Sequence, residues 1–312
     1  MDNCFLVTGC GGFIASKLIK ELKNDDPNQR IIGIDNFTTG YQDNIPDDIF
    51  FYKGDCADRD LLNIIFGKHK ISKIFHFAAQ SSGEISFDNP EYDLKTNTLS
   101  TLYLLDKSVE YEVDQFIFAS TMSVYGDANE KASEVHKCNP KSFYGVGKLA
   151  SENYLSIYKR QFNLNCISLR LFNVYGPGQN LKNLRQGMVS IYLAQLMKSK
   201  DIEVHGSLKR FRDLIYIDDV TRIILNLTKW RSFDFDVLNI GTGLKTSVEN
   251  IILGICNALE VSYKDIKITH PKETLGDING IYANNERLLE SIPMDFIKFD
   301  QGILKMVDSV ND

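Results

Sequence analysis

Tyr144 and Lys148 lie four positions apart in residues 142–152, SFYGVGKLASE. A tyrosine has an ordinary pKa of about 10, so a tyrosine that acts as a base near pH 7 needs roughly 4 kcal/mol of preference for its phenolate. One ammonium group ~4 Å away, at an effective dielectric constant of ~20, supplies about that much. On a helix this spacing places both side chains on one face. The pair is therefore either a base with its tuning cation or an ordinary solvated pair, and the elements around it must distinguish the two.

The first half of the chain alternates short apolar runs with longer amphipathic segments. We expect helices near 13–24, 58–69, 91–111 and 143–161, and buried strands at residues 4–9, 30–35, 49–55, 73–79, 115–120 and 165–170. Strands that alternate with helices of this length predict βαβ units and a parallel sheet. Right-handed crossovers then give an α/β fold with a doubly wound, Rossmann-type parallel sheet, which binds ligands at the carboxyl ends of its strands.

The pattern becomes less regular after Arg170. Residues 171–187 are rich in Gly, Asn and Pro, which is typical of a long functional loop. We expect further helices at 187–199, 218–230, 247–259 and 300–310, and short strands at 202–206, 214–217 and 236–240. The pattern thus predicts a dinucleotide-binding domain over 1–171, with returning segments near 213–240. A smaller C-terminal α/β domain, mainly 172–312, would cover the strand ends and bind the substrate.

Composition excludes several classes of protein. The 312 residues carry a formal net charge of −6, so no broad basic field is available for nucleic acid. No apolar run approaches the roughly 18 residues of a membrane span, and the N-terminus lacks the features of a signal peptide. The six cysteines are scattered without a Cys-x-x-Cys spacing, which favours reduced thiols over a metal site or disulfides. We expect a cytoplasmic protein with no metal and no membrane or nucleic-acid partner.

A turn of small residues joins the first expected strand to the first expected helix. Gly9 can form the tight turn, and Gly12 lets the backbone approach a pyrophosphate at the positive end of the helix. Asp35 ends the second strand about 20 residues further on, where its carboxylate would accept hydrogen bonds from both ribose hydroxyls and repel a 2′-phosphate. Neither Asn36 nor Phe37 is a cation, so the sequence predicts NAD rather than NADP. The small residues of the turn are Gly9, Gly11, Gly12 and Ala15.

With these features in place, the chain resembles the extended short-chain dehydrogenases/reductases, in the nucleotide-sugar epimerase/dehydratase family. Eight motifs carry the resemblance, in the family's order and spacing: TGCGGFI, DNFTTG, GDCAD, FHFAAQ, STMSVYG, YGVGK, LRLFNVYGPGQ and RDLIYIDDV. Asp55 and Cys56 would border the adenine, while Asn97 would fix the helix beneath the cofactor. The resemblance thus implies a set of NAD-binding residues: Gly9, Gly11, Gly12, Phe13, Ile14, Asp35, Asn36, Asp55, Cys56, Ala78, Ala79, Asn97, Tyr144 and Lys148. We interpret His76 as a packed core residue.

The resemblance also implies roles for the pair described first. Tyr144 would take a proton from a sugar hydroxyl while the adjacent carbon gives a hydride to NAD. Lys148 would lower the pKa of the phenol and hold the nicotinamide ribose. Ser120 and Thr121 would occupy the hydroxyl positions at the end of the fifth strand, with Thr121 as the catalytic one that relays the proton to Tyr144.

The residues after Thr121 bear on the reaction. The dehydratases of the family have Asp-Glu there and its decarboxylases keep a Glu, whereas this chain has Met122 and Ser123. Neither side chain is a general acid or base near neutral pH, so the chemistry would stop at reversible oxidation. The expected function is an NAD-dependent epimerase, similar to UDP-glucose 4-epimerases, that inverts C4 of a UDP-hexose through a transient 4-keto intermediate. The alternatives are another nucleotide-sugar oxidoreductase or dehydratase of this fold and a non-catalytic NAD-sensing protein.

The nucleotide-sugar contacts are also implied by the resemblance. Asn173 would bind a phosphate oxygen, Arg212 would neutralise the diphosphate, and Asp277 lies in the segment that resembles the family's Arg-x-x-Gly-Asp. The arginine of that segment is Thr274 here, so one expected cation is missing, and Arg185, Lys209 or Arg210 are its candidate replacements. Asp213 would brace the loop at residues 170–180, and Asp218 and Asp219 would cap the next helix.

The sequence of residues 80–90 differs from the family's usual sequence. We expect Ser81, Ser82 and Glu84 of this segment to bind the sugar hydroxyls. For Glu84, a solvent-facing loop position is an equal alternative. The helices near 91–111 and 143–161 resemble the pair that forms an intersubunit four-helix bundle, so we expect a homodimer. Leu99, Leu102 and Leu105 would then face the partner, unless they pack on the sheet instead.

Overall fold

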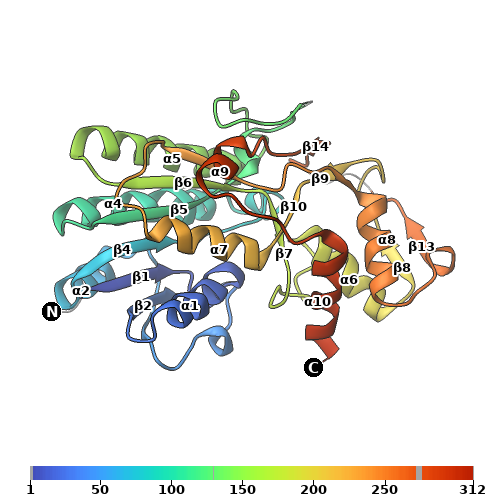
Figure 1. Ribbon diagram of the computed structural model, residues 1–312, viewed down its shortest axis with the longest axis horizontal. Helices are drawn as coiled ribbons and strands as arrows, with labels where there is room; N and C mark the ends of the chain where they lie inside the picture. Colours follow the sequence, from blue (N-terminus) through green and yellow to red (C-terminus); the bar gives the residue numbers. More distant parts are fainter. Residues whose placement is uncertain (1–2, 129, 272–275, 312) are drawn as a thin grey trace.

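A seven-stranded parallel sheet is the centre of the molecule (Figure 1). The structure, a computed structural model, describes residues 3–128, 130–271 and 276–311. The sheet has the order β11-β6-β5-β4-β1-β2-β3. Its first six strands follow the 3-2-1-4-5-6 order of doubly wound dinucleotide-binding folds, so the predicted α/β fold is confirmed. The strands are β1 Cys4–Thr8, β2 Arg30–Asp35, β3 Phe50–Lys53, β4 Ile71–His76, β5 Gln115–Thr121, β6 Cys166–Leu171 and β11 Val237–Ile240.

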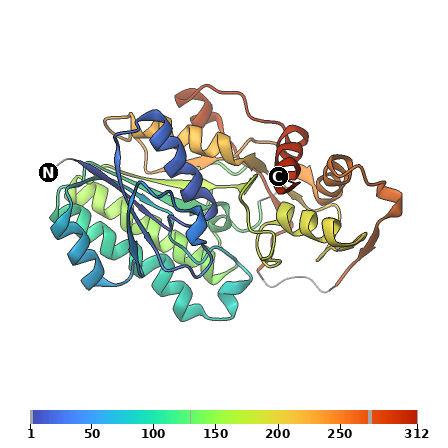
Figure 2. The same cartoon turned by 90° about the horizontal axis from the view of Figure 1, so that it is seen from below.

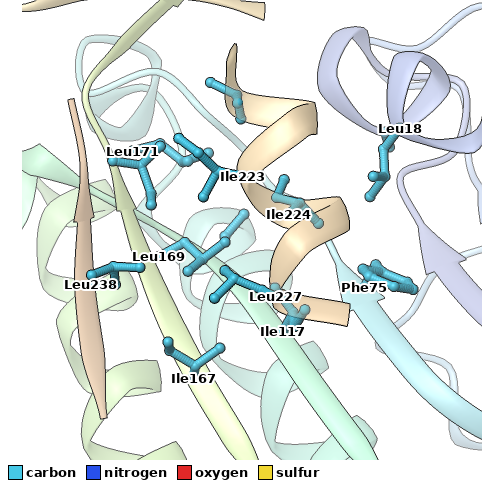
Figure 3. Packing of buried hydrophobic residues seen from close by; sticks show 14 of the residues in the cluster. Leu18, Phe75, Ile117, Ile167, Leu169, Leu171, Ile223, Ile224, Leu227 and Leu238 are labelled. Atoms are coloured by element: carbon cyan, nitrogen blue, oxygen red, sulfur yellow. The ribbon is translucent and has the colours of Figure 1, made fainter. Parts of the chain in front are cut away.

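Helices cover both faces of this sheet (Figure 2). On one face α1 (Phe13–Asp25) and α7 (Ile217–Thr228) bury Leu18, Ile223, Ile224 and Leu227 against strand residues that include Phe75, Ile117, Ile167 and Leu169 (Figure 3). On the other face α2 (Arg59–Lys68), α4 (Ser100–Glu110) and α5 (Phe143–Phe162) pack on the alternate residues of the same strands. Strands that are buried on both faces read as continuous apolar runs, which is why the sequence pattern located them.

The expected helix over 91–111 is interrupted. It begins as α3 (Pro90–Leu94), whose N-cap Asn89 accepts a hydrogen bond from the backbone N–H of Tyr92 at 3.0 Å. A π-helical turn, η3 (Lys95–Leu99), follows and buries Thr96, Asn97 and Thr98 before α4 starts at Ser100. Such π-turns are frequent at functional sites, and this one lies beside the carboxyl end of the sheet. The continuous amphipathic pattern gave no sign of the interruption.

The remaining elements gather mainly beyond the carboxyl edge of the sheet (Figure 1). Their own core lies between α6, α8 and α10 and includes Leu193, Ile252 and Met306. The helices of this part are α6 Met188–Lys198, α8 Val248–Ala258, α9 Glu286–Ser291 and α10 Phe299–Asn311. The short strands are β7 Asn173–Tyr175, β8 Asp201–Glu203, β9 Phe211–Arg212, β10 Leu214–Tyr216, β12 Thr246–Ser247, β13 Lys267–Thr269 and β14 Gly280–Ile281. Among the helices of the described residues, none is both long and apolar enough to cross a membrane.

Two expectations for this half of the chain change. The segment 171–187 is not one loop, because β7 pairs in parallel with β10. Asp218 and Asp219 do not cap α7, whose N-cap is Tyr216 and which has no side-chain cap. Both carboxylates lie inside the first turn, where the helix dipole favours negative charge.

These two carboxylates form tertiary contacts instead of caps. Asp219 is buried and accepts hydrogen bonds from the backbone N–H of Ile297 at 2.8 Å and from Arg222 at 2.6 Å. Asp218 pairs with Lys17 of α1 at 3.1 Å. The acidic pair therefore ties the start of α7 to α1 and to the segment that leads into α10.

Candidate active site

One cleft runs along the carboxyl ends of the strands and collects most of the predicted site residues. Its other wall comes from β7, the loop that follows it and the start of α6, including Gln179, Asn183 and Met188. Five predicted residues do not line the cleft, namely Asn97, Ser82, Glu84, Arg212 and Asp277. The predicted residues that do line it are Gly9, Gly11, Gly12, Phe13, Ile14, Asp35, Asn36, Asp55, Cys56, Ala78, Ala79, Ser81, Ser120, Thr121, Tyr144, Lys148 and Asn173.

The glycine turn forms one end of the cleft. Gly9 has a positive φ of 69°, and a Cβ there would come within 2.8 Å of the backbone nitrogen of Ala78. At Gly11 a Cβ would lie 2.8 Å from the carbonyl oxygen of Tyr41. The N-cap of α1 is Gly12, which supplies no side chain to the first N–H groups of the helix. A narrow turn without side chains before a helix N-terminus is the arrangement that binds a pyrophosphate.

Asp35 closes the second strand beside this turn. One carboxylate oxygen accepts a hydrogen bond from the backbone N–H of Gly11 at 2.9 Å, and the other accepts one from Phe37 at 2.7 Å. Each carboxylate oxygen can accept a second bond, so the side chain can still bind a ribose hydroxyl. Lys53 lies over the Phe37 ring, 5.7 Å from its centroid, and does not line the cleft.

The catalytic candidates meet at the end of β5. Ser142 caps α5 by accepting a hydrogen bond from the backbone N–H of Gly145 at 3.1 Å, which starts the helix just before Tyr144. Lys148 is 1% exposed, and its Nζ donates to the carbonyl oxygen of Ala119 at 2.8 Å. The Thr121 hydroxyl hydrogen-bonds the Tyr144 phenol. The structure thus brings Thr121, Tyr144 and Lys148 together, as the sequence predicted.

The electrostatics of this pair differ from the expectation. Burial raises the pKa of Tyr144 to about 12, against the opposing effect of the hydrogen bond with Thr121. Burial lowers the pKa of Lys148 to about 7, while the carboxylates of Asp93 and Glu152 act in the other direction. The expected lowering of the phenol pKa by Lys148 is therefore not present, because burial penalises both charged forms and the amine bonds the Ala119 carbonyl.

Of the three residues predicted to contact the sugar hydroxyls, one lines the cleft. Ser81 lines it and accepts a hydrogen bond from Gln186 at 2.5 Å. Ser82 is buried and donates to the carbonyl oxygen of Arg185 at 3.0 Å. Glu84 pairs with the Arg185 guanidinium at 2.8 Å. Of the two readings of Glu84, the structure supports an exposed loop acid, since its carboxylate is engaged by Arg185.

The predicted diphosphate residues divide into two groups. Asn173 lines the cleft, and its side-chain nitrogen donates to the carbonyl oxygen of Asp213 at 3.2 Å. Arg212 is buried beside the cleft and donates to Asp277 at 2.7 Å, and Arg210 pairs with the same carboxylate. Thr274, the position of the missing arginine, lies outside the described residues.

The carboxylate of Asp213 braces other segments than the predicted loop at 170–180. Its two carboxylate oxygens accept hydrogen bonds from the backbone N–H groups of Thr242, Gly243 and Ala283 at 2.8, 2.9 and 3.0 Å. The Thr242 hydroxyl donates to it as well, at 2.6 Å. This buried carboxylate thus joins the loop after β11 to the segment after β14.

Comparison with known proteins agrees with this geometry. The family model "NAD dependent epimerase/dehydratase family" matches residues 5–241. The chain belongs to this family. It is 32% identical to the putative UDP-glucose 4-epimerase of Methanocaldococcus jannaschii over 305 residues, 97% of each chain. The crystal structure of the UDP-glucose 4-epimerase of Thermotoga maritima with UDP-glucose is also similar, with a TM-score of 0.93, 30% identity and 99% of each chain covered. The human dTDP-D-glucose 4,6-dehydratase is 30% identical over 254 residues, which cover 78% of this chain and 70% of the relative.

The cleft fits a dinucleotide of the kind that this family uses. The hydroxyl of Thr96 and the side-chain oxygen of Gln179 line the cleft and are buried without a hydrogen-bond partner. The helix N-terminus after Gly12, the carboxylate of Asp35 and the ammonium of Lys148 offer groups that suit a pyrophosphate and two ribose rings. Asn97 lies below the cleft, where its side-chain nitrogen donates to the carbonyl oxygen of Gln80 and to Asp93, both at 3.0 Å.

Several lining residues were missed by the sequence reading. They are amides on the loop that follows β7: Gln179, Asn180, Asn183 and Gln186. The sequence predicts a functional loop here but gives no role to its individual residues. The many Asn and Gln side chains of this segment were the feature that could have identified them. The buried charges Asp93, Glu152 and Arg170 were missed as well, since a charged residue on an amphipathic helix or at a strand end reads as exposed.

Proposed function

We propose that this protein is an NAD-dependent nucleotide-sugar epimerase that inverts C4 of a UDP-hexose through a transient 4-keto sugar. The observation that carries the proposal is the convergence of Thr121, Tyr144 and Lys148 at the cleft, directly followed by Met122 and Ser123. The first three residues can move a proton at a sugar hydroxyl. The next two add no general acid or base that would extend the chemistry beyond oxidation and return.

The proton transfer follows from the contacts of the described residues. Tyr144 accepts the proton of the C4 hydroxyl, directly or through the Thr121 hydroxyl to which it is bonded. NAD held by the glycine turn, Asp35 and Lys148 would supply the hydride acceptor for C4 and the hydride donor for the 4-keto sugar. Lys148 provides a buried ammonium beside Tyr144, and its charge is attractive to a developing phenolate. The proton then returns from Tyr144 to the sugar oxygen, so no net oxidation occurs.

Dehydration is the strongest enzymatic alternative, since relatives of both activities match the chain. Loss of the C6 hydroxyl needs an acid and a base near C5 and C6. Met122 and Ser123 occupy the relevant positions, and both line the cleft. The Met122 thioether accepts a hydrogen bond from Asn173 at 3.5 Å, and the Ser123 hydroxyl accepts one from Thr121 at 3.2 Å. These neutral groups support epimerisation over dehydration.

We further propose that the nucleotide diphosphate lies against Asn173. Arg212 becomes available to a phosphate only if it exchanges part of its bond to Asp277, because the pair is formed beside the cleft at 2.7 Å. Such an exchange replaces one carboxylate partner by another anion, which keeps the buried guanidinium neutralised. Asp277 would then hold the arginine in place between substrates, together with Arg210.

The test is incubation with UDP-glucose, UDP-galactose and their N-acetyl and uronic relatives, in plain and deuterated water. We expect one of these pairs to interconvert without solvent deuterium in the product and without steady NADH production. Steady NADH production would instead indicate a net oxidoreductase, and a 4-keto-6-deoxy product would indicate a dehydratase. NAD binding without turnover of any of these sugars would favour the sensing alternative.

A further inference from the structure

Three consecutive residues at the end of β5 are bonded, one by one, to one face of α5. The carbonyl oxygen of Ala119 accepts a hydrogen bond from Lys148 at 2.8 Å. The hydroxyl of Ser120 donates to the carboxylate of Glu152. The hydroxyl of Thr121 bonds the phenol of Tyr144. On the helix the three partners are spaced by four residues, so they form a single row that faces the strand.

Glu152 is the member of this row that is also anchored elsewhere. Arg170 of β6 donates to both of its oxygens, from Nε to Oε1 at 3.0 Å and from Nη2 to Oε2 at 2.7 Å. Both side chains of this pair are buried. Arg170 is itself fixed by a hydrogen bond to the carbonyl oxygen of Glu134 at 3.2 Å and by stacking over Tyr125, 4.6 Å from the ring centroid. A bidentate, buried pair of this kind holds its carboxylate in one orientation.

We propose that Glu152, held by Arg170, is a positioning residue for the reaction, and that Ser120 serves this role rather than substrate binding. Through Ser120 it fixes the register of α5 against β5, which places Tyr144 and Lys148 at the end of the strand. Its carboxylate also supplies a fixed negative charge one helical turn from Lys148. The inference rests on the proposed function, since it concerns how the residues of that reaction are held.

The charges around Lys148 explain why this carboxylate matters. Burial drives the ammonium towards its neutral form, and the net pKa of Lys148 is about 7. Asp93 of α3 and Glu152 oppose that effect, while His76 of β4 is buried with a lowered pKa, which keeps it neutral. Burial raises the pKa of Asp93, whereas Glu152 is paired with a guanidinium. Glu152 is held in place by Arg170, and removing its carboxylate shifts Lys148 further towards the neutral amine.

The experiment compares three variants of the full chain with wild type, in steady-state kinetics with the active UDP-sugar across pH. Glu152→Gln keeps the shape but removes the charge, so kcat should fall about tenfold and its alkaline limb should move to lower pH. Ser120→Ala keeps the Glu152–Arg170 pair. In this variant kcat should fall, whereas KM and the pH profile should stay unchanged. Glu152→Asp keeps the charge but shortens the side chain, so it should lower kcat without moving the pH limb.

Ser168→Ala is the matched control, because this buried β6 hydroxyl has no hydrogen-bond partner, and it should leave kcat unchanged. Unaltered kcat and pH profiles in Glu152→Gln, or a rise in KM as the main effect of Ser120→Ala, would overturn the proposal. If Glu152→Gln fails to fold, Ser120→Ala decides alone. The titration of the Lys148 side chain, followed by NMR in wild type and Glu152→Gln, needs no turnover. It therefore separates failure of this inference from failure of the proposed function.

Discussion

Tyr144 must be deprotonated to act as a base, but burial stabilises its protonated form. With its pKa raised to about 12, the phenol alone is a poor base at neutral pH. The hydrogen bond with Thr121 opposes this effect of burial, and positive charge on the nicotinamide would stabilise the phenolate further when NAD is bound. The residue therefore works as a base only within the complete site.

Replacing Tyr144 tests this directly. Tyr144→Phe keeps the ring and its packing but removes the ionisable oxygen, so turnover should fall by roughly a hundredfold or more. Binding of NAD and of the nucleotide sugar should stay nearly intact in calorimetry. Thr121→Val should lower turnover less, because it removes a hydrogen bond and leaves the base.

Tyr158→Phe is the matched control for that experiment. Tyr158 lies on the same helix, outside the cleft, and its hydroxyl donates to Asp106. Its loss should leave turnover within about twofold, as expected for a partly exposed hydrogen bond. Wild-type turnover in Tyr144→Phe would mean that the Tyr–Lys pair is structural.

Lys148 predicts a conflict between stability and activity. A lysine whose pKa falls from 10.5 to about 7 on folding binds fewer protons in the folded state over that interval, so its cost is full below about pH 7 and fades towards pH 10.5. Lys148→Met should therefore raise the free energy of unfolding, on the order of 5 kcal/mol near pH 6, with a smaller gain near pH 10. Thermal unfolding at both pH values measures this, and a gain that is equal at both would contradict the assigned cause. Turnover should be lost in the same variant.

For single residues, the sequence predicted which side chains meet at the cleft better than it predicted their burial and contacts. Tyr144 and Lys148 were selected by their spacing, and Thr121 by the resemblance of its strand end to a family motif; all three line the cleft. The contact of Lys148 with the Ala119 carbonyl and the burial of both ionisable groups depend on how α5 packs on β5. That packing is tertiary, so a pattern in one segment does not contain it.

At the scale of the elements, ion pairs anchor the loop between β7 and α6, which lines the cleft. Arg185 pairs with Glu84 at 2.8 Å and with Asp88 at 2.7 Å, so this loop is tied to the segment around η2 (Ile85–Phe87). Gln186, one residue further, lines the cleft and bonds Ser81. Exposed pairs of this kind contribute little stability, but they restrict a loop that carries several lining amides.

Arg185→Ala should therefore affect substrate binding rather than folding. We expect KM for the nucleotide sugar to rise a few-fold, with kcat within about twofold of wild type, because the loop loses its tie while the end of β5 is untouched. The difference in KM between this variant and wild type should shrink at high salt, because salt screens the ion pairs of the wild-type protein. Lys182→Ala, on the same loop but outside these ion pairs, is the control, and an equal effect of both substitutions would argue against the tie.

The accuracy of the element predictions followed the strength of the periodic signal. The seven strands of the main sheet and the long helix α5 were predicted closely, because most of them are buried on defined faces. The π-turn η3 was missed because its apolar positions continue the helical pattern, and β7 was missed because a three-residue strand has too few positions to show alternation. Strands this short are stabilised by the backbone hydrogen bonds to their partner strand, as β7 is by its pairing with β10.

On the scale of the whole molecule, the outer surface of α3, η3 and α5 is unusually apolar. Leu94 is 58% exposed, and Leu99, Leu102 and Tyr154 line a shallow groove with it. Leu105 is buried against the sheet, so only part of the predicted leucine set faces outward. Exposed apolar surface that runs along two helices is typical of a protein–protein interface.

We predict that two copies of this chain associate through this surface in solution. The exposed side chains of α5 fall on one stripe at helical spacing, from Val146 through Tyr154 to Ile157, next to Leu94 and the groove. Two such surfaces can bury each other in a symmetric dimer, which is the commonest form of homo-oligomer. Sedimentation of the wild-type chain should therefore show a dimer at micromolar concentration.

Ile157→Asp should convert that dimer into a monomer, because a carboxylate in the centre of an apolar interface loses its hydration without a partner. Ile157 is 44% exposed, so the monomer itself should fold with nearly unchanged thermal stability. Ile64→Asp is the matched control: Ile64 lies on α2, is 48% exposed and is not part of the groove, so this variant should remain dimeric. A wild-type chain that sediments as a monomer at all concentrations would contradict the prediction, and so would loss of the dimer in both variants.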